Sequence, residues 1–304
     1  MRFQKAELAG VLAPPSARIK APRSAAPSRR SECGRALARE NELRLMKTVM
    51  QFGHARLAEL ARAVWPANQY GIQMANRTAK RLVQQGLLFP RRNSLGGTSL
   101  CISRPGAVWL DARGISARDT LSLSSIAGPS FFHRTLATRY LIERQVIGDS
   151  VAGEYAIFRG QLPFSIDGLA SSLRKMPDGL VWRDHPGGYH SEKVRRVEWV
   201  EQEAAMKARP EIERCLRAAE HVSTRLSDDG RTVLVGMVFV FDDALSHARR
   251  ILHAADSLWG HKSATERALL ERRVKLVCVK LRPPLTWISH SDTTLHEYRQ
   301  RQSV

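Results

Sequence analysis

The stretch VLVGMVFVF at residues 233–241 decides the fold class of this chain. It is almost wholly apolar and contains Gly236, but it is much shorter than the roughly 18 apolar residues that a membrane span requires. A short apolar run of this kind is typical of a strand buried on both faces of a sheet. Residues 211–226 before it and residues 243–258 after it have apolar side chains at helical spacing. The pattern therefore predicts a central strand between two helices in an α/β protein.

The same kind of pattern extends over residues 129–284. A helix is predicted at residues 129–145, and further strands are predicted at 154–158, 176–182, 194–203 and 274–281. His185 and Pro186, followed by two glycines, predict a turn between two of these strands. We therefore expect an α/β domain with a mixed sheet over residues 129–284, followed by a polar, frayed tail at residues 285–304.

Residues 39–112 have a different pattern, in which helices come first. Helices are predicted at residues 41–50, 57–64 and 68–85, then strands at 87–89 and 99–102, then a short helix at 105–110. Asn68 is a suitable N-cap for the third helix, and Gly86 is a suitable C-cap. Three helices followed by a β-hairpin predict a winged helix-turn-helix domain over residues 39–112.

The third helix of this domain carries the predicted DNA-binding side chains. Its solvent face holds Gln73, Asn76, Arg77, Lys80 and Arg81. In a helix-turn-helix protein such a helix enters the major groove, and Arg91 and Arg92 on the hairpin would then lie beside the phosphates. Two alternatives stay open: a basic three-helix bundle with an ordinary solvated face, and a winged domain that binds proteins.

The net charge also indicates a nucleic-acid partner. The chain of 304 residues has 48 Lys and Arg residues against 29 Asp and Glu residues, which gives a formal net charge of +19. A strongly basic protein most often binds a polyanion, and double-stranded DNA is the partner expected here. The 4 cysteines are far apart and lack zinc-site spacing, which predicts reduced thiols in a cytoplasmic protein. No apolar stretch is long enough for a membrane span.

The first residues differ in composition from the rest of the chain. Residues 1–38 are rich in Ala, Pro, Ser and Arg without a steady period, which predicts a disordered basic arm that contacts phosphates non-specifically. The alternatives are a solvated tail, an organellar transit peptide, and a misassigned start codon with Met46 as a candidate first residue. Residues 113–128, with several serines and glycines, are the expected linker between the two domains.

Acidic side chains on two neighbouring predicted strands form a candidate catalytic site. Asp178 follows a proline at the start of one strand, and Glu201 and Glu203 share one face of the next strand because they are two residues apart. Asp178 and Glu201 would bind Mg²⁺ or Mn²⁺, which activates water for phosphodiester hydrolysis. Lys207, at or just before the next helix, would add positive charge at the scissile phosphate.

This order of elements and motifs resembles the PD-(D/E)xK nuclease superfamily. More narrowly, it looks like the plasmid replication-relaxation family, which includes mobilisation-type accessory proteins with an N-terminal winged helix. The matching pieces are FHR at residues 132–134, MPDG at 176–179, and VEQE at 200–203 with Lys207. The resemblance implies a DNA-binding protein that acts in replication, relaxation or mobilisation of a plasmid or mobile element. It also implies relaxosome or replication proteins as partners, and a homodimer is a further expectation.

One departure from the family pattern leaves several interpretations of the second domain open. The lysine of the usual motif stands two residues after the strand carboxylate, and Glu203 occupies that position here. Three interpretations stay open: an active metal-dependent endonuclease, a nuclease-like fold that does not cut DNA, and an unrelated α/β domain. In a transcriptional regulator, the second domain would only dimerise or sense. His133 and Glu143 are further candidate residues near the acids.

Overall fold

The computed structural model describes residues 29–120, 130–185, 193–203, 207–227, 230–242, 245–282 and 285–302. It separates two compact units, Met1–Ala38 and Arg39–Val304, and most of the described residues belong to the second unit. Helix α1 (Arg29–Phe52) begins inside the range expected to be disordered, so that expectation is wrong for residues 29–38. Pro27 is the last proline before this helix, and a run without proline permits helical hydrogen bonding. The rest of the predicted arm lies outside the described residues.

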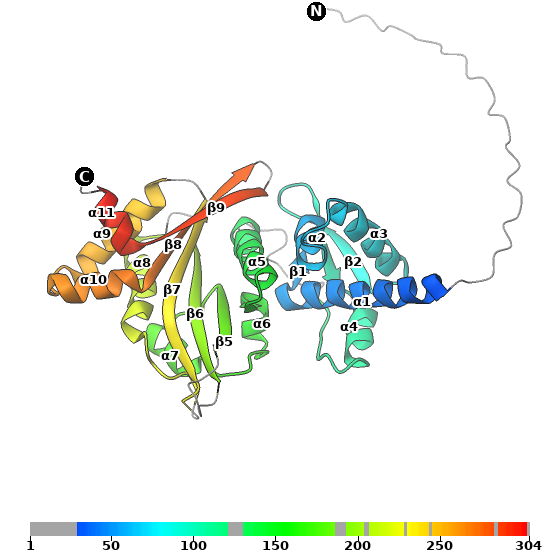
Figure 1. Ribbon diagram of the computed structural model, residues 1–304, viewed down its shortest axis with the longest axis horizontal. Helices are drawn as coiled ribbons and strands as arrows, with labels where there is room; N and C mark the ends of the chain where they lie inside the picture. Colours follow the sequence, from blue (N-terminus) through cyan, green and yellow to red (C-terminus); the bar gives the residue numbers. More distant parts are fainter. Residues whose placement is uncertain are drawn as a thin grey trace, which may run out of the picture. The chain divides into compact units, whose positions relative to one another are not determined.

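Residues 39–120 combine helices with a small antiparallel sheet (Figure 1). After α1 come the helices α2 (Leu57–Val64), α3 (Gly71–Gln84) and α4 (Arg104–Asp111). The strands β1 (His54–Ala55), β2 (Leu88–Arg92) and β3 (Thr98–Ile102) lie in the order β1-β3-β2. The predicted helix at 57–64 and the predicted hairpin are thereby confirmed. Residues 115–120 of the expected linker have neither helix nor strand, and residues 121–128 lie outside the described part.

Local geometry sets the start and the end of α3. Its apolar face joins a core that includes Leu45, Met46, Leu60, Leu82 and Ile102. The helix begins at Gly71, later than predicted, because the side-chain oxygen of Asn68 accepts the N–H of Tyr70 at 2.8 Å in a turn that precedes the helix. Gly86 follows the helix with a φ of +70°, a conformation that favours glycine, as predicted.

The second part of the unit is α/β, as predicted. Its first elements are α5 (Ser130–Val146), β4 (Ser150–Gly153), α6 (Glu154–Phe158), α7 (Asp167–Leu173), β5 (Gly179–His185) and β6 (Val194–Glu203). The rest are α8 (Arg209–Leu216), a 3₁₀ turn (Arg217–His221), β7 (Thr232–Asp242), α9 (Leu245–Trp259), α10 (Ala264–Arg272), β8 (Val274–Arg282), β9 (Thr286–Thr294) and α11 (Leu295–Gln302). Within the described ranges, no helix has both the length and the apolar character needed to cross a bilayer.

The sheet is mixed and has the order β4-β5-β6-β7-β8-β9. Strands β6, β7 and β8 are parallel to one another, and the outer pairs are antiparallel. The apolar stretch at residues 233–241 lies in β7, between two parallel partners, where both faces of a strand are buried. Helix α5 packs on one face of the sheet through Leu141 against Val200 and Val240. Helices α7 to α10 cover the other face, where Trp199 and Phe239 are buried.

Two predicted elements of this domain are wrong. Residues 154–158, expected as a strand, form helix α6, and the preceding residues form the edge strand β4 instead. The N–H of Glu154 donates to the carbonyl of Asp178 at 3.1 Å, which ends the strand and starts the helix. The helix expected at 211–226 is shorter, since α8 ends at Leu216 and a 3₁₀ turn follows. The predicted turn after His185 lies outside the described residues.

The expectation of a frayed C-terminal tail is also wrong. Residues 286–294 form strand β9, which pairs with β8, and α11 follows with Leu295 fully buried. Most side chains of β9 are exposed, so its sequence lacks the alternation that marks a half-buried strand. Backbone hydrogen bonds to β8 hold it at the edge of the sheet, and such bonds do not depend on apolar side chains.

Ion pairs connect α2 with α5 inside the second unit. Arg62 of α2 lies 2.6 Å from Glu143 of α5, and Arg139 lies 2.8 Å from the same carboxylate. Arg56 also donates to the carbonyl of Leu285 at 3.1 Å. Glu143, a candidate near the acids in the sequence, is thus engaged by two arginines at the α2–α5 contact, and it does not belong to the acidic cluster around Glu201.

His54 makes folding stability sensitive to acid. Burial lowers the pKa of its imidazole to about 4, and the nearby cations Arg134, Arg56 and Arg91 contribute to that lowering. Because the unfolded chain takes up this proton near pH 6.5 and the folded chain does not, stability falls as the pH drops from about 6.5 to about 4. We expect a loss of about 3 kcal/mol over this range from His54 alone.

Urea unfolding at several pH values measures this effect. In His54→Gln the fall in stability between pH 6.5 and pH 4 should be smaller than in the wild type, because Gln does not titrate. The exposed His253 provides the matched control, His253→Gln. An equal pH dependence in all three proteins would contradict the assignment to His54.

Candidate functional site

The structure brings a set of polar and basic side chains together on the exposed side of α3. Gln73, Arg77, Lys80 and Arg81 are exposed and Asn76 is half-buried, while Ala75, Ala79 and Leu82 face the core. The face contains no acidic residue of α3 itself. Arg81 differs from its neighbours, because its Nε lies 2.5 Å from the carboxylate of Glu42 on α1. Among the described residues, the positive charge of α3 that has no acidic partner therefore belongs mainly to Arg77 and Lys80.

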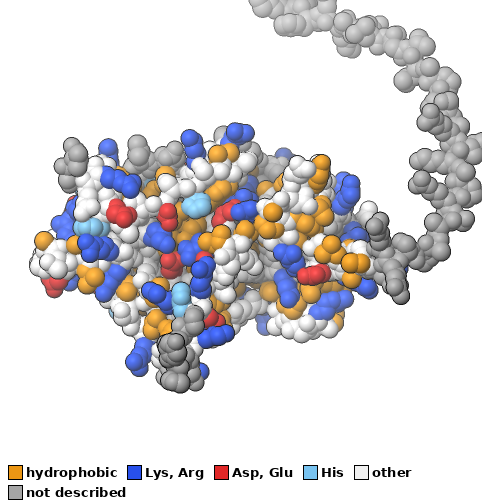
Figure 2. All heavy atoms as spheres, viewed as in Figure 1, with side chains coloured by type: hydrophobic (Ala, Val, Ile, Leu, Met, Phe, Trp, Pro, Cys, Tyr) orange, Lys and Arg blue, Asp and Glu red, His pale blue; other side chains and the backbone are white. Residues whose placement is uncertain are grey.

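The β2–β3 hairpin places its two arginines differently. Arg92 is exposed at the end of β2, where it can reach a ligand outside the protein. Arg91 is half-buried, and it lies close enough to His54 and Cys101 to act on the pKa of both groups, in each case in the lowering direction. Both arginines lie on β2 of the predicted hairpin, but only Arg92 is exposed there. On the face drawn in Figure 2, Lys and Arg side chains outnumber Asp and Glu side chains.

A second cluster lies where β5 begins and where β6 ends. Asp178 precedes β5, and its backbone N–H donates to the carbonyl of Val200 on β6 at 3.1 Å. Its neighbour Gly179 permits close packing of α5, since a Cβ there would lie 2.7 Å from Leu141. Glu201 and Glu203 lie at the end of β6 and are almost completely buried. The structure therefore brings Asp178 to the end of β6 at which both glutamates lie.

Lys207 reaches back to the acids from the residues before α8. Its Nζ lies 3.5 Å from Glu201 Oε2 and 3.6 Å from Glu203 Oε2, and it donates to the carbonyl of Gln202 at 3.0 Å. The backbone N–H of Lys207 also donates to Glu203 Oε1 at 3.2 Å. The displaced lysine of the sequence motif is thus beside the carboxylates despite its unusual spacing.

Two further residues join the cluster from other parts of the chain, and only one of them was suggested by the sequence. Lys175, in the loop between α7 and β5, lies 3.0 Å from Glu201 Oε2, and sequence analysis did not predict it. His133 of α5 places its Nε2 at 2.9 Å from Asp178 Oδ1, which agrees with its suggested place near the acids. The sequence offered one indication of Lys175, since it stands three residues before Asp178. The spacing of residues does not show, however, that the loop directs this side chain to Glu201.

Burial and charge act in opposite directions on these groups. Burial acts to raise the pKa of Asp178, but the hydrogen bond with His133 and the charges of His133 and Lys207 outweigh it and lower that pKa to about 2. Burial raises the pKa of Glu201, and the charge of Asp178 adds to that effect. The pKa of Lys207 is raised, since Glu201 and Asp178 outweigh its burial. The cluster is therefore a network of ion pairs around the fully buried Glu201.

The carboxylate oxygens that were expected to bind Mg²⁺ or Mn²⁺ already have partners. Asp178 accepts from His133 and from the N–H of Gln202, and Glu201 accepts from the indole of Trp199 at 2.7 Å and contacts both lysines. Among the described residues, no group of three or more His, Cys, Asp or Glu side chains could hold a metal. A divalent cation at Asp178 and Glu201 would have to compete with these hydrogen bonds and with the two lysine ammonium groups.

Comparison of the chain with family models, with curated proteins and with solved structures finds no match. A function for this chain therefore has to be inferred from the two clusters of side chains and from the arrangement of elements that holds them.

Proposed function

We propose that this chain is a DNA-binding protein that uses residues 39–112 as a winged helix. The observation that carries the proposal is the exposed face of α3, on which Arg77 and Lys80 stand among amide side chains without an acidic partner among the described residues. Arginine, lysine and amide groups are those that read base edges and phosphates in the major groove. The hairpin β2–β3, with Arg92 exposed, supports a phosphate contact beside the groove.

The arrangement of the remaining elements supports a nuclease-like second domain. A helix, two antiparallel strands that carry Asp178 before β5 and Glu201 near the end of β6, and a lysine beside Glu201 are the parts that the PD-(D/E)xK resemblance implies. On this basis we place the protein in replication, relaxation or mobilisation of a bacterial plasmid or mobile element, in the cytoplasm. Relaxosome or replication proteins and a second copy of the chain are the partners that this role implies.

Equilibrium binding to duplex DNA tests the proposal. Fluorescence anisotropy with labelled duplexes of different sequence, at several salt concentrations, gives both the affinity and the number of phosphates contacted. A linear fall of log K with log salt supports the electrostatic interface. Absence of binding at low salt would overturn the proposal. With a net charge of +19 and weak screening by salt, an exposed basic face that serves as a DNA interface must bind duplex DNA under these conditions.

The alternative function is a metal-dependent endonuclease, which the convergence of Asp178, Glu201 and Lys207 favours. Because Lys175 and Lys207 neutralise Glu201, we expect plasmid DNA to be bound but not nicked in Mg²⁺ or Mn²⁺ beyond the level seen in EDTA. Purified wild type and Asp178→Ala should behave alike in this assay. Metal-dependent nicking that disappears in Asp178→Ala would instead establish the endonuclease.

A further inference from the structure

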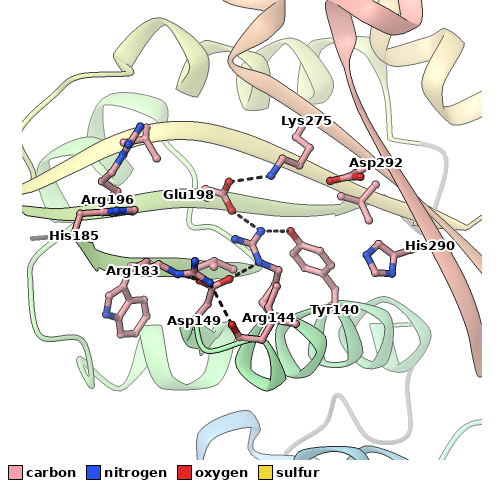
Figure 3. Close-up of a pocket in the computed structure, with 15 residues that line it drawn as sticks. Tyr140, Arg144, Asp149, Arg183, His185, Arg196, Glu198, Lys275, His290 and Asp292 are labelled. Atoms are coloured by element: carbon pink, nitrogen blue, oxygen red, sulfur yellow. Dashed lines mark hydrogen bonds and ion pairs between the residues drawn. The ribbon is translucent and has the colours of Figure 1, made fainter. Parts of the chain in front are cut away.

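A polar cavity of about 430 Å³ lies on the face of the sheet that α5 covers only in part (Figure 3). It is lined by the second half of α5 and the turn after it, and by side chains of strands β5 to β9. Its volume lies within the range of small-ligand sites, roughly 300 to 1,000 Å³. It shares no residue with α3, with the hairpin or with the cluster at Glu201.

Arg144 organises the floor of this cavity. Its guanidinium lies 2.7 Å from Asp149 and 2.7 Å from Glu198, and it donates to the hydroxyl of Tyr140 at 2.9 Å. Figure 3 shows Arg144 between these partners. The other oxygen of Asp149 accepts from Arg183 at 2.8 Å, and that of Glu198 accepts from Lys275 at 3.2 Å. Each carboxylate oxygen on the floor therefore already has a cationic donor.

The cations of the cavity exceed what these two acids can neutralise. Arg144, Arg183 and Lys275 together bring one positive charge more than Asp149 and Glu198. Arg196 adds another, because it is exposed and has no hydrogen-bond or ion-pair partner among the residues that the structure describes. Unused N–H donors therefore remain in the cavity, above all on Arg196.

The unused donors gather at one end of the cavity. Arg196 and His185 lie together there, next to Arg183, whose side chain is 50% exposed (Figure 3). The acid Asp292 lies with His290 at the opposite end, so it does not compensate Arg196. An anion at the Arg196 end would meet donors from β5 and β6 and no unpaired carboxylate among the described residues.

We propose that this end of the cavity binds a phosphate group. Arginine forks suit the oxygens of phosphate, and Arg183, which Asp149 holds in place, lies across from Arg196 on the neighbouring strand. Binding then has to order mainly the side chain of Arg196. The phosphate can come from a free nucleotide or from a nucleic-acid strand, since both present the same group. The inference does not depend on DNA binding by α3, which has no residue in this cavity.

Calorimetric titration with pyrophosphate tests the proposal on the full chain. We expect saturable binding to the wild type and about tenfold weaker binding to Arg196→Gln, the loss expected for one charge-assisted contact. Arg195→Gln is the matched control, because Arg195 lies on the opposite face of β6 with Asp184 and the ring of Phe164. It should bind like the wild type. His185→Gln gives a second variant in the proposed site, and it should also bind more weakly than the wild type.

The source of the phosphate follows from two further titrations. A deoxynucleoside triphosphate that competes with pyrophosphate, and whose affinity falls in Arg196→Gln, assigns a free nucleotide. If only a single-stranded oligonucleotide competes with pyrophosphate and loses affinity in Arg196→Gln, the phosphate belongs to a nucleic-acid strand. No binding of any of the three probes, or equal losses in Arg195→Gln and Arg196→Gln, would overturn the proposal. Thermal unfolding of each variant verifies that the substitutions leave the fold intact.

Discussion

The double substitution Arg77→Ala and Lys80→Ala is expected to weaken binding to duplex DNA by about 10-fold to 100-fold. Both side chains are exposed on α3 and neither has an acidic partner among the described residues, so both charges are available to a ligand. If both contact phosphates, the slope of log K against log salt should become shallower by about 2. If one reads a base edge, its loss should also reduce the preference for one duplex sequence.

Two control variants distinguish a local effect of the α3 side chains on DNA affinity from an effect of the total charge. Arg272 is an exposed arginine on α10, and Arg272→Ala removes a charge far along the chain without touching α3. It should change the affinity by much less than either α3 substitution. Arg81→Ala should have an intermediate effect, since Glu42 already offsets that guanidinium. Equal losses in Arg272→Ala and in the α3 variants would show that binding responds only to overall charge, and the winged-helix interface would be wrong.

Removing both lysines from the cluster at Glu201 is expected to cost about 3 to 5 kcal/mol of folding free energy at neutral pH. In Lys175→Met with Lys207→Met, Glu201 keeps the indole of Trp199 as a donor but loses both cations in a fully buried position. An uncompensated buried carboxylate is much less stable than a paired one. Urea unfolding of the variant against the wild type measures the difference.

The pH dependence of the same variant has a defined sign. Without the lysines, the folded-state pKa of Glu201 lies further above its unfolded value, so the unfolded chain binds fewer protons in that range. Because burial already raises the wild-type pKa of Glu201 above 4.5, the deficit relative to the wild type should begin to grow only above that wild-type folded pKa, and it should increase as the pH rises further. Adding Glu201→Gln to the lysine variant should recover part of the stability, because the amide carries no charge.

An exposed lysine of β8 supplies the control, Lys280→Met. If Lys175→Met with Lys207→Met unfolds at the same urea concentration as Lys280→Met, the ion pairs at Glu201 do not stabilise the fold.

Much of the candidate site was predictable from local pattern. Glu201 and Glu203 had to share one face because side chains alternate along a strand, and β6 has the predicted bounds. Asp178 had to start the adjacent strand because a Pro-Asp-Gly sequence opens a turn. Lys207 was close enough in sequence to reach back, and its Nζ lies within 3.6 Å of both glutamates.

The partners of these acids were not predictable in the same way. Lys175 contacts Glu201 across 26 positions of the chain, and this contact depends on how the loop before β5 folds over the end of β6. The conformation of the loop before β5 therefore decides whether lysines neutralise Glu201 or leave it open to a metal ion. No local pattern in the sequence encodes that conformation. The pairing of Arg81 with Glu42 is of the same kind, and it changes which residues of α3 carry free charge.

The fold class, the central strand and the basic face of α3 can all be predicted from the amino-acid sequence. Each follows from periodicity or from the charge of neighbouring residues, which are local properties of the chain. The edge strand β9 cannot be predicted in this way, because its exposed side chains carry no pattern and its backbone is held by β8. The cavity around Arg144 also depends on tertiary folding, because it assembles side chains from one helix and five strands, from Tyr140 to Asp292 in the sequence. Hydrogen bonds and ion pairs between distant segments form only after the sheet has brought the segments together, and for that reason the sequence does not display them.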